Sequence, residues 1–134
     1  MAVAVAFASH ANADTDDARL DSVEHCQTNQ STMNECAEHR LDQAEQAMNV
    51  EIQKLRGLLA DSERLEFFEK EVEAWHAYRD AHCLANNLYA SGSFGIAYGN
   101  RCREELTKDR TRKLEDFAAQ LSNADKQPYA AIEY

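Results

Sequence analysis

Apolar residues recur at intervals of three or four along three long stretches of the chain, which is the spacing of one face of an α-helix. The first stretch runs from Gln30 to Leu59, and Asn29 before it is a residue type that caps helix N-termini. The second runs from about Glu63 to Asn86 and the third from about Arg101 to Ser122. We therefore predict a helix over each stretch. The stripe positions are Met33, Ala37, Leu41, Ala44, Met48, Ile52, Leu55 and Leu59 in the first; Leu65, Phe68, Val72, Trp75, Arg79, His82 and Cys83 in the second; and Cys102, Leu106, Arg110, Leu114, Phe117 and Leu121 in the third.

The segment between the second and third stretches reads as a loop. Asn87 to Asn100 contains three of the 4 glycines and no charged residue. No part of the chain alternates strictly enough to predict a strand, and the whole sequence has only 1 proline. The predicted fold class is all-α: a long antiparallel helical hairpin plus a third helix laid against it.

The two ends of the chain differ in composition from the predicted three-helix domain at residues 29–122. Residues 1–13 hold a short apolar run followed by Ala11 and Ala13, the small-residue pattern of a signal-peptide cleavage site. A basic segment before the run is missing, so the signal is truncated or atypical. Residues 14–28 read as a flexible acidic lead-in, and residues 123–134 as a loose tail. The expected product is periplasmic or secreted, with no membrane insertion.

The four cysteines of this short, exported chain predict two disulfides. A local scheme pairs Cys26 with Cys36 and Cys83 with Cys102. It is favoured because it would attach the lead-in to the first helix and close the glycine-rich loop. A crossed scheme, Cys36 with Cys83 and Cys26 with Cys102, also stays open because Cys36 and Cys83 fall at nearly the same height of the hairpin.

A zinc site is the alternative use of the cysteines. Cys36 and His39 can share a helix face, and His25–Cys26 and His82–Cys83 are adjacent pairs. However, no paired C-x-x-C motif is present, and this spacing is the stronger mark of a structural zinc site. We expect no metal and no other cofactor.

One charge, Arg79, lies in the second stripe at a position that the pattern reserves for the core. If the hairpin turns near residues 60–62, Glu45 faces Arg79. A buried unpaired guanidinium would be costly, so we predict an Arg79–Glu45 ion pair of bidentate geometry. The alternative is that Arg79 reaches solvent past Trp75. Arg110 raises the same question in the third stripe, without an evident partner.

The charge balance restricts the kind of partner. Acidic residues outnumber basic ones 24 to 14, which gives a net charge of -10 and a pI near 4.9. This excludes a nucleic-acid binder, because phosphate backbones are held by clustered Lys and Arg. It favours a basic protein as partner, since opposite charges steer association.

A catalytic role has little support in the sequence. Arg79 and Asp80, with His76 and His82, could be imagined as acid–base groups. No nucleophile motif, phosphate-cradling loop or metal cluster accompanies them. We expect a protein that is not an enzyme.

A family resemblance rests on four pieces of sequence in order. They are NQSTMNECA at 29–37, preceded by Cys26; AEQAMNVEIQKL at 44–55; WHAYRDAHC at 75–83; and Cys102, Thr107, Arg110 and Leu114. In this order and with this cysteine placement, the chain resembles the LprI-type lysozyme-inhibitor N-terminal domain family. It departs from the family pattern at Thr32, Glu45, Ile52 and Val72. The resemblance implies an exported helical protein and, for some members, binding and inhibition of lysozyme, but it carries no functional residues onto this chain.

The expected function is therefore that of an exported envelope protein that binds and blocks lysozyme. The uncharged loop is the candidate partner-binding segment, with Ser91, Ser93 and Phe94 as candidate contacts. The alternative is a periplasmic interaction or scaffold module that binds another basic protein and does not inhibit lysozyme.

Overall fold

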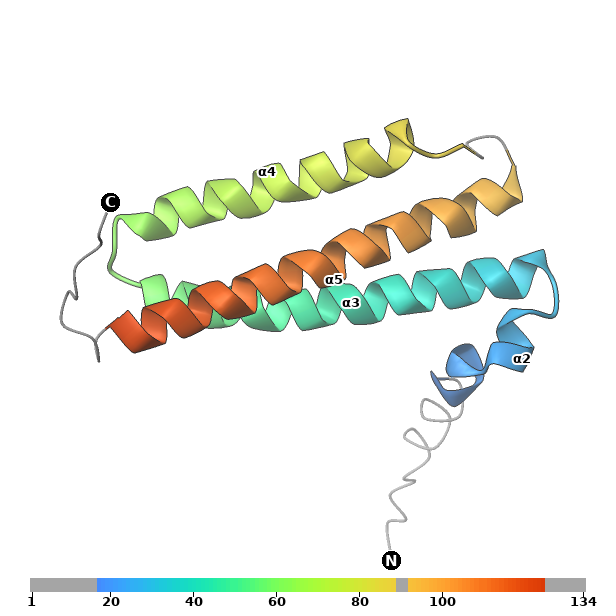
Figure 1. The fold of residues 1–134 in the computed structure, drawn as a ribbon, viewed down its shortest axis with the longest axis horizontal. Helices are drawn as coiled ribbons and strands as arrows, with labels where there is room; N and C mark the ends of the chain where they lie inside the picture. Colours follow the sequence, from blue (N-terminus) through green and yellow to red (C-terminus); the bar gives the residue numbers. More distant parts are fainter. Residues whose placement is uncertain (1–16, 89–91, 125–134) are drawn as a thin grey trace, which may run out of the picture.

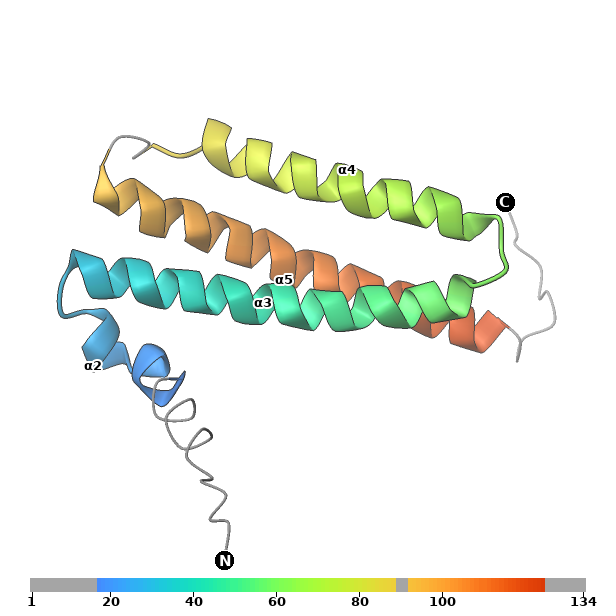
Figure 2. The ribbon, with the colours of Figure 1, turned by 180° about the vertical axis from the view of Figure 1, so that it is seen from behind.

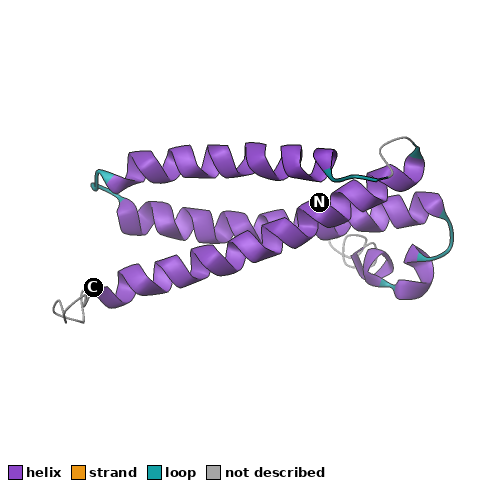
Figure 3. Cartoon of the chain, turned by 45° about the horizontal axis from the view of Figure 1, so that its top comes forward, coloured by secondary structure: helices purple, strands orange, loops and turns teal. Residues whose placement is uncertain are grey.

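The computed structural model describes residues 17–88 and 92–124, and within these ranges the regular structure is helical throughout (Figure 3). A short helix α2 (Val23–Cys26) precedes three long helices, α3 (Gln30–Leu59), α4 (Arg64–Ala85) and α5 (Ser93–Ala124). Each long helix runs antiparallel to the one before it (Figure 1). The predicted all-α fold, a helical hairpin with a third helix against it, is confirmed. Among the described helices, none has both the length and the apolar character needed to cross a bilayer.

Helix α3 has the bounds that the sequence predicts, because both of its ends carry local signals. At its start, the Asn29 side chain accepts from the backbone N–H of Thr32 at 3.0 Å, and the Thr32 hydroxyl accepts from the backbone N–H of Asn29 at 3.2 Å. This reciprocal pair is a capping box, which satisfies N–H groups that the helix itself leaves unpaired. At its end, Asp61 adopts a left-handed conformation with φ 64° and turns the chain toward α4.

Helix α5 begins at Ser93, eight residues before the predicted start near Arg101, so the prediction of a loop over all of 87–100 was wrong. Two of the three glycines that suggested a loop, Gly95 and Gly99, are part of the helix and are buried, while Gly92 precedes it. The connection from α4 is correspondingly short. Asn87 Nδ2 donates to the backbone oxygen of Gly95 at 2.9 Å and ties the end of α4 to the first turn of α5.

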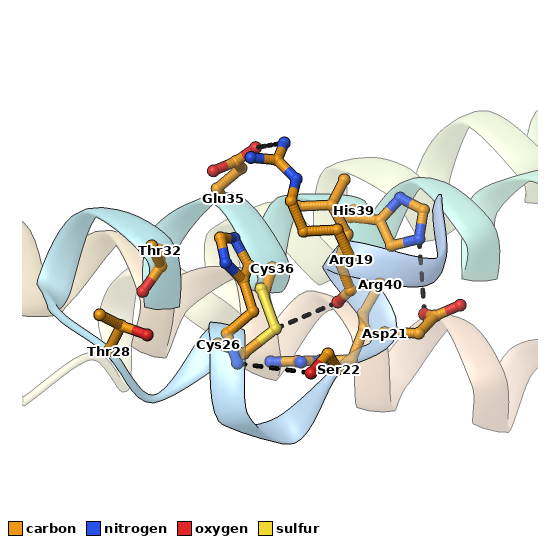
Figure 4. Close-up of a disulfide and its surroundings, with 12 residues drawn as sticks. Arg19, Asp21, Ser22, Cys26, Thr28, Thr32, Glu35, Cys36, His39 and Arg40 are labelled. Carbon is orange, nitrogen blue, oxygen red and sulfur yellow. Dashed lines mark hydrogen bonds and ion pairs between the residues drawn. A yellow bond between two sulfur atoms is a disulfide. The ribbon is translucent and has the colours of Figure 1, made fainter. Parts of the chain in front are cut away.

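The sequence predicted a flexible lead-in at residues 14–28, but the described part of this segment contains helical turns. Residues 17–21 are helical, and Ser22 caps α2 by accepting from the backbone N–H of His25. This segment is attached to α3 by a disulfide, by an ion pair of Arg19 with Glu35 at 2.9 Å and by a contact of Asp21 with the His39 ring at 3.5 Å (Figure 4). These cross-links explain why polar residues with no helical periodicity are nevertheless ordered. The predicted signal peptide and the tail from residue 125 onward lie outside the described residues.

Helices α3 and α5 approach each other most closely, while α4 packs at a greater distance (Figures 1 and 2). Side-chain size accounts for this difference, because α5 buries small residues and α4 brings larger ones to the core, such as Phe68 and Arg79. The buried positions of α5 are Gly95, Gly99, Glu104, Thr107, Thr111, Leu114 and Ala118. Of the predicted third stripe only Leu114 is among them, and the other stripe residues are partly buried. The core cluster consists of Met48, Ile52, Leu55, Leu59, Phe68, Leu114 and Ala118.

A bidentate ion pair fastens α3 to α4 beside their turn. Arg56 Nε and Nη2 donate to the two carboxylate oxygens of Glu69 at 2.6 and 3.0 Å. The hydrogen bonds from Arg56, reinforced by its charge, hold the pKa of Glu69 below its ordinary value. Since the folded-state pKa is depressed, this pair stabilises the fold above the unfolded pKa of about 4.3, and the contribution is lost as the pH falls through the folded pKa.

We therefore expect Glu69→Gln to be less stable than the wild type at neutral pH and to approach it in acid. Denaturant unfolding measured across this pH range tests the expectation. Glu73→Gln, at an exposed position on the same helix, is the matched control. Its free energy of unfolding should change with pH in the same way as that of the wild type. A constant difference between Glu69→Gln and the wild type down to acidic pH would contradict the assignment.

Candidate functional site

The end of the bundle that holds the α4–α5 connection is uncharged and apolar. No Asp, Glu, Lys or Arg occurs from Leu84 to Asn100 in a chain whose net charge is -10. Large apolar side chains are exposed there, with Leu88 83% and Leu84 65% accessible. We call this surface the tip and define it by the exposed residues Leu84, Leu88, Phe94, Ile96 and Tyr98. The start of α3 reaches the same end of the molecule (Figure 1).

The three residues predicted to contact a partner lie in different parts of the structure. Ser91 lies outside the described residues. Ser93 is exposed as the first residue of α5, and its backbone oxygen accepts from Gln30 Nε2 at 3.5 Å, which joins the tip to the start of α3. Phe94 is 44% exposed in the first turn of α5. Two of the candidates therefore belong to a rigid helix rather than to a loop.

Two clefts flank the tip. One of about 370 Å³ lies between α2, α3 and the start of α5, and Val23, Met33, Phe94 and Tyr98 are part of its lining. The other, of about 440 Å³, lies between α4 and α5 and is also bordered by Tyr98. The exposed apolar side chains of the tip therefore project beside open clefts.

Both disulfides lie at this end of the bundle and have the local pairing. Cys26 is bonded to Cys36 with a Cα–Cα distance of 5.8 Å, and Cys83 to Cys102 with 5.7 Å. The crossed scheme is therefore wrong. The Cys26–Cys36 bond joins α2 to α3 (Figure 4), and the Cys83–Cys102 bond joins α4 to α5 directly below the tip. Together they restrain the elements from which the tip projects.

The disulfide at Cys36 also decides against the zinc alternative, since that sulfur is bonded to Cys26 and is no longer a thiolate ligand. His39, the second candidate ligand, faces Asp21 instead. Within residues 17–88 and 92–124, no group of three or more His, Cys, Asp or Glu side chains is arranged to hold a metal ion.

Arg79 is buried at the centre of a polar cluster between the helices. Its Nη1 donates to Glu45 Oε1 at 2.8 Å and to Thr107 Oγ1 at 3.1 Å, and its Nε donates to Asp80 Oδ1 at 3.0 Å. The guanidinium also lies 5.5 Å from the centre of the Trp75 ring. The expected bidentate geometry toward Glu45 was wrong, because the guanidinium is divided among three acceptors. This cluster links α3, α4 and α5 beneath the surface and has a structural role.

The other residues considered for acid–base chemistry have structural contacts. His76 Nδ1 lies 2.8 Å from the Val72 backbone oxygen, and the His76 ring meets Trp75 edge-on. Arg110, whose partner the sequence did not reveal, bonds to Glu71 of α4.

Sequence reasoning missed one buried charge, Glu104. Only 7% of this residue is exposed, and its carboxylate contacts Arg40 at 3.5 Å and Lys108 at 2.6 Å. The i,i+4 spacing of Glu104 and Lys108 was a visible signal for the second contact. The burial was not visible, because it follows from the close packing of α5 on α3.

The fold and its cross-links define a small, acidic, disulfide-linked protein of three long antiparallel helices. A family model described as "Lysozyme inhibitor LprI" matches residues 22–114. The chain belongs to this family, as its sequence motifs indicate. No curated protein and no solved structure matches the chain.

Proposed function

We propose that this protein is exported and inhibits lysozyme by inserting its tip into the substrate cleft of the enzyme. Membership of the LprI lysozyme-inhibitor family is the observation that carries the proposal. The two disulfides support export, because such bonds persist in oxidising compartments outside the cytoplasm.

The charge and the tip supply the physical basis. Common lysozymes are strongly basic, so a partner with a net charge of -10 would be steered toward them. The lysozyme cleft contains two catalytic carboxylates, and an inserted acidic side chain would be repelled by them. An uncharged apolar tip avoids this repulsion, while the acidic remainder of the bundle lies against the basic surface around the cleft. Phe94 and Ser93 are the candidate contacts on the described part of the tip.

A turbidity assay of cell-wall lysis by a c-type lysozyme tests the proposal at low ionic strength. The mature protein should slow lysis in proportion to its concentration. Phe94→Asp should weaken inhibition about tenfold, which corresponds to about 1.4 kcal/mol of binding energy. Val50→Asp is the matched control, because Val50 is also an exposed apolar helix residue (65% accessible) and lies on α3 away from the tip.

No slowing of lysis at large molar excess of the wild type would overturn the proposal. The alternative, an envelope interaction module without inhibitory activity, would then be supported if the protein still captured another basic protein from periplasmic extract.

A further inference from the structure

Helix α4 carries a second apolar face on the side away from the core. Phe67, Ala74 and Ala81 follow one another at intervals of seven, and Ala77 and Leu84 repeat the same interval between them. This is the heptad spacing of a helix face that packs against another surface. We call this surface the outer face of α4 and define it by Phe67, Ala74, Ala77, Tyr78, Ala81, Leu84 and Ala85, all of them exposed.

The outer face lies opposite the side of α4 that packs in the bundle. The inward side uses a different set of residues, including Phe68, Trp75 and Cys83. In all three ribbon views α4 forms an edge of the bundle, and no other described helix covers its outer side (Figures 1 to 3). A solvent-facing helix side normally carries charged and polar residues, so an apolar outer side requires another explanation.

The exposed apolar side chains extend over most of the helix. Phe67 near its start is 68% accessible, Tyr78 in its middle 56%, and Leu84 near its end 65%. From Phe67 to Ala85 the face is about 27 Å long at 1.5 Å per residue. Lys70 interrupts this row of apolar side chains, since its Nζ lies 5.7 Å from the centre of the Phe67 ring. Exposed large apolar side chains along one helix side nevertheless mark an interaction site in a small protein. The small alanines between the larger residues allow a partner to approach the helix closely.

The charges beside the face indicate what kind of partner it takes. Glu66, Glu73 and Asp80, also at intervals of seven, form an acidic row along one edge of the face, and Asp80 in this row already accepts from Arg79 and Arg103. Lys70 is the only basic residue within the face itself, and it is bonded to Glu66 at 3.1 Å. A second copy of the chain would bring an acidic row and a charge of -10 against the same charges, which is unfavourable. A basic protein would instead be attracted by the net charge of -10 and by Glu73 in this row while it covers the outer face.

The outer face is continuous with the tip, because Leu84 near the end of α4 belongs to both. We infer that the outer face of α4 is part of the binding surface for the basic protein partner, so that the contact runs from the tip along α4. This inference rests on the proposed function and extends it: with lysozyme as the partner, the tip occupies the cleft and the outer face of α4 lies along the basic surface beside it.

Calorimetric titration of the full disulfide-bonded protein with a c-type lysozyme tests the inference. Ala81→Arg places a long cationic side chain in the middle of the outer face at an exposed position that tolerates it. It should weaken binding at least tenfold, and Ala74→Arg, two turns away, should have the same effect. Gln46→Arg makes the same change of charge on the exposed side of α3 and should stay within twofold of the wild type. Thermal unfolding should show that all three variants are folded.

The possible failures are distinguishable. Wild-type affinity of both Ala81→Arg and Ala74→Arg would overturn the inference and leave the proposed function intact. A wild-type dimer in sedimentation that Ala81→Arg dissociates would also overturn it, because the face would then belong to a second copy of the chain. A wild type that does not bind lysozyme at all would overturn the proposed function and this inference together.

Discussion

Replacement of Arg79 by alanine should lower the free energy of unfolding by about 3 kcal/mol. The Arg79 side chain is only 7% exposed. Its guanidinium contacts residues on all three long helices. Its removal leaves the fully buried Thr107 hydroxyl without its donor and takes away the contact with the Trp75 ring. An unsatisfied buried hydroxyl alone costs about 1–3 kcal/mol. Denaturant unfolding of the purified variant measures the effect.

Glu45→Gln is the informative companion to this variant. Glu45 is more exposed than Arg79, and its glutamine replacement still offers an oxygen to Arg79 Nη1. We expect a loss of about 1 kcal/mol for this change. A loss below about 1 kcal/mol for Arg79→Ala would show that the cluster does not hold the three helices together.

Removal of the Cys83–Cys102 disulfide, by alanine at both positions, should cost about 3 kcal/mol. The bond spans 19 residues and closes the α4–α5 connection, so its loss enlarges the conformational freedom of the unfolded chain. It also fixes the two helices beneath the tip, and we expect the variant to lose lysozyme inhibition at temperatures where it is still folded.

The other disulfide supplies the comparison. Cys26–Cys36 spans 10 residues, and the shorter loop predicts a cost lower by about 0.5 kcal/mol when both cysteines become alanine. This variant should keep the tip and its inhibitory activity, because α4 and α5 remain linked. Equal loss of inhibition in the two double variants would contradict the positioning role of Cys83–Cys102.

Periodicity was sufficient for α3, because that helix buries a stripe of recognisably apolar residues. It was also sufficient for α4, where Leu65, Val72 and Trp75 are partly buried against the core beside the buried Phe68. The bounds of α3 followed from that stripe and from Asn29, whose capping role is local. Helix α5 was harder to predict, since it buries Gly95, Gly99, Thr107 and Thr111. These small residues do not form a recognisable apolar stripe in the sequence, but their small size permits α5 to pack closely on α3. The early start of α5 was missed for the same reason.

A contact between side chains could be predicted from the sequence where the register of the two helices was enough to bring them together. Glu45 and Arg79 meet because a helical hairpin with a turn near residue 61 places them at one height. The division of Arg79 between Glu45, Asp80 and Thr107 depended on α5, whose position the pattern did not supply. The burial of Glu104 was hidden for the same reason.

The candidate site was found in part. The uncharged segment that contains Phe94 could be read from composition, but its helical form could not. The outer face of α4 could not be predicted from the sequence, because a single apolar stripe per helix is enough to account for a helical bundle. The alanines and exposed large residues on the other side became visible only when the structure showed which side of α4 faces the core.

Calorimetric titration of a c-type lysozyme with the mature protein, at low and at high ionic strength, tests the central claim most directly. We expect a saturable one-to-one complex at low salt, with an affinity that falls steeply as salt screens the opposite charges. Absence of binding heat at low salt, with the protein folded and both disulfides formed, would contradict it.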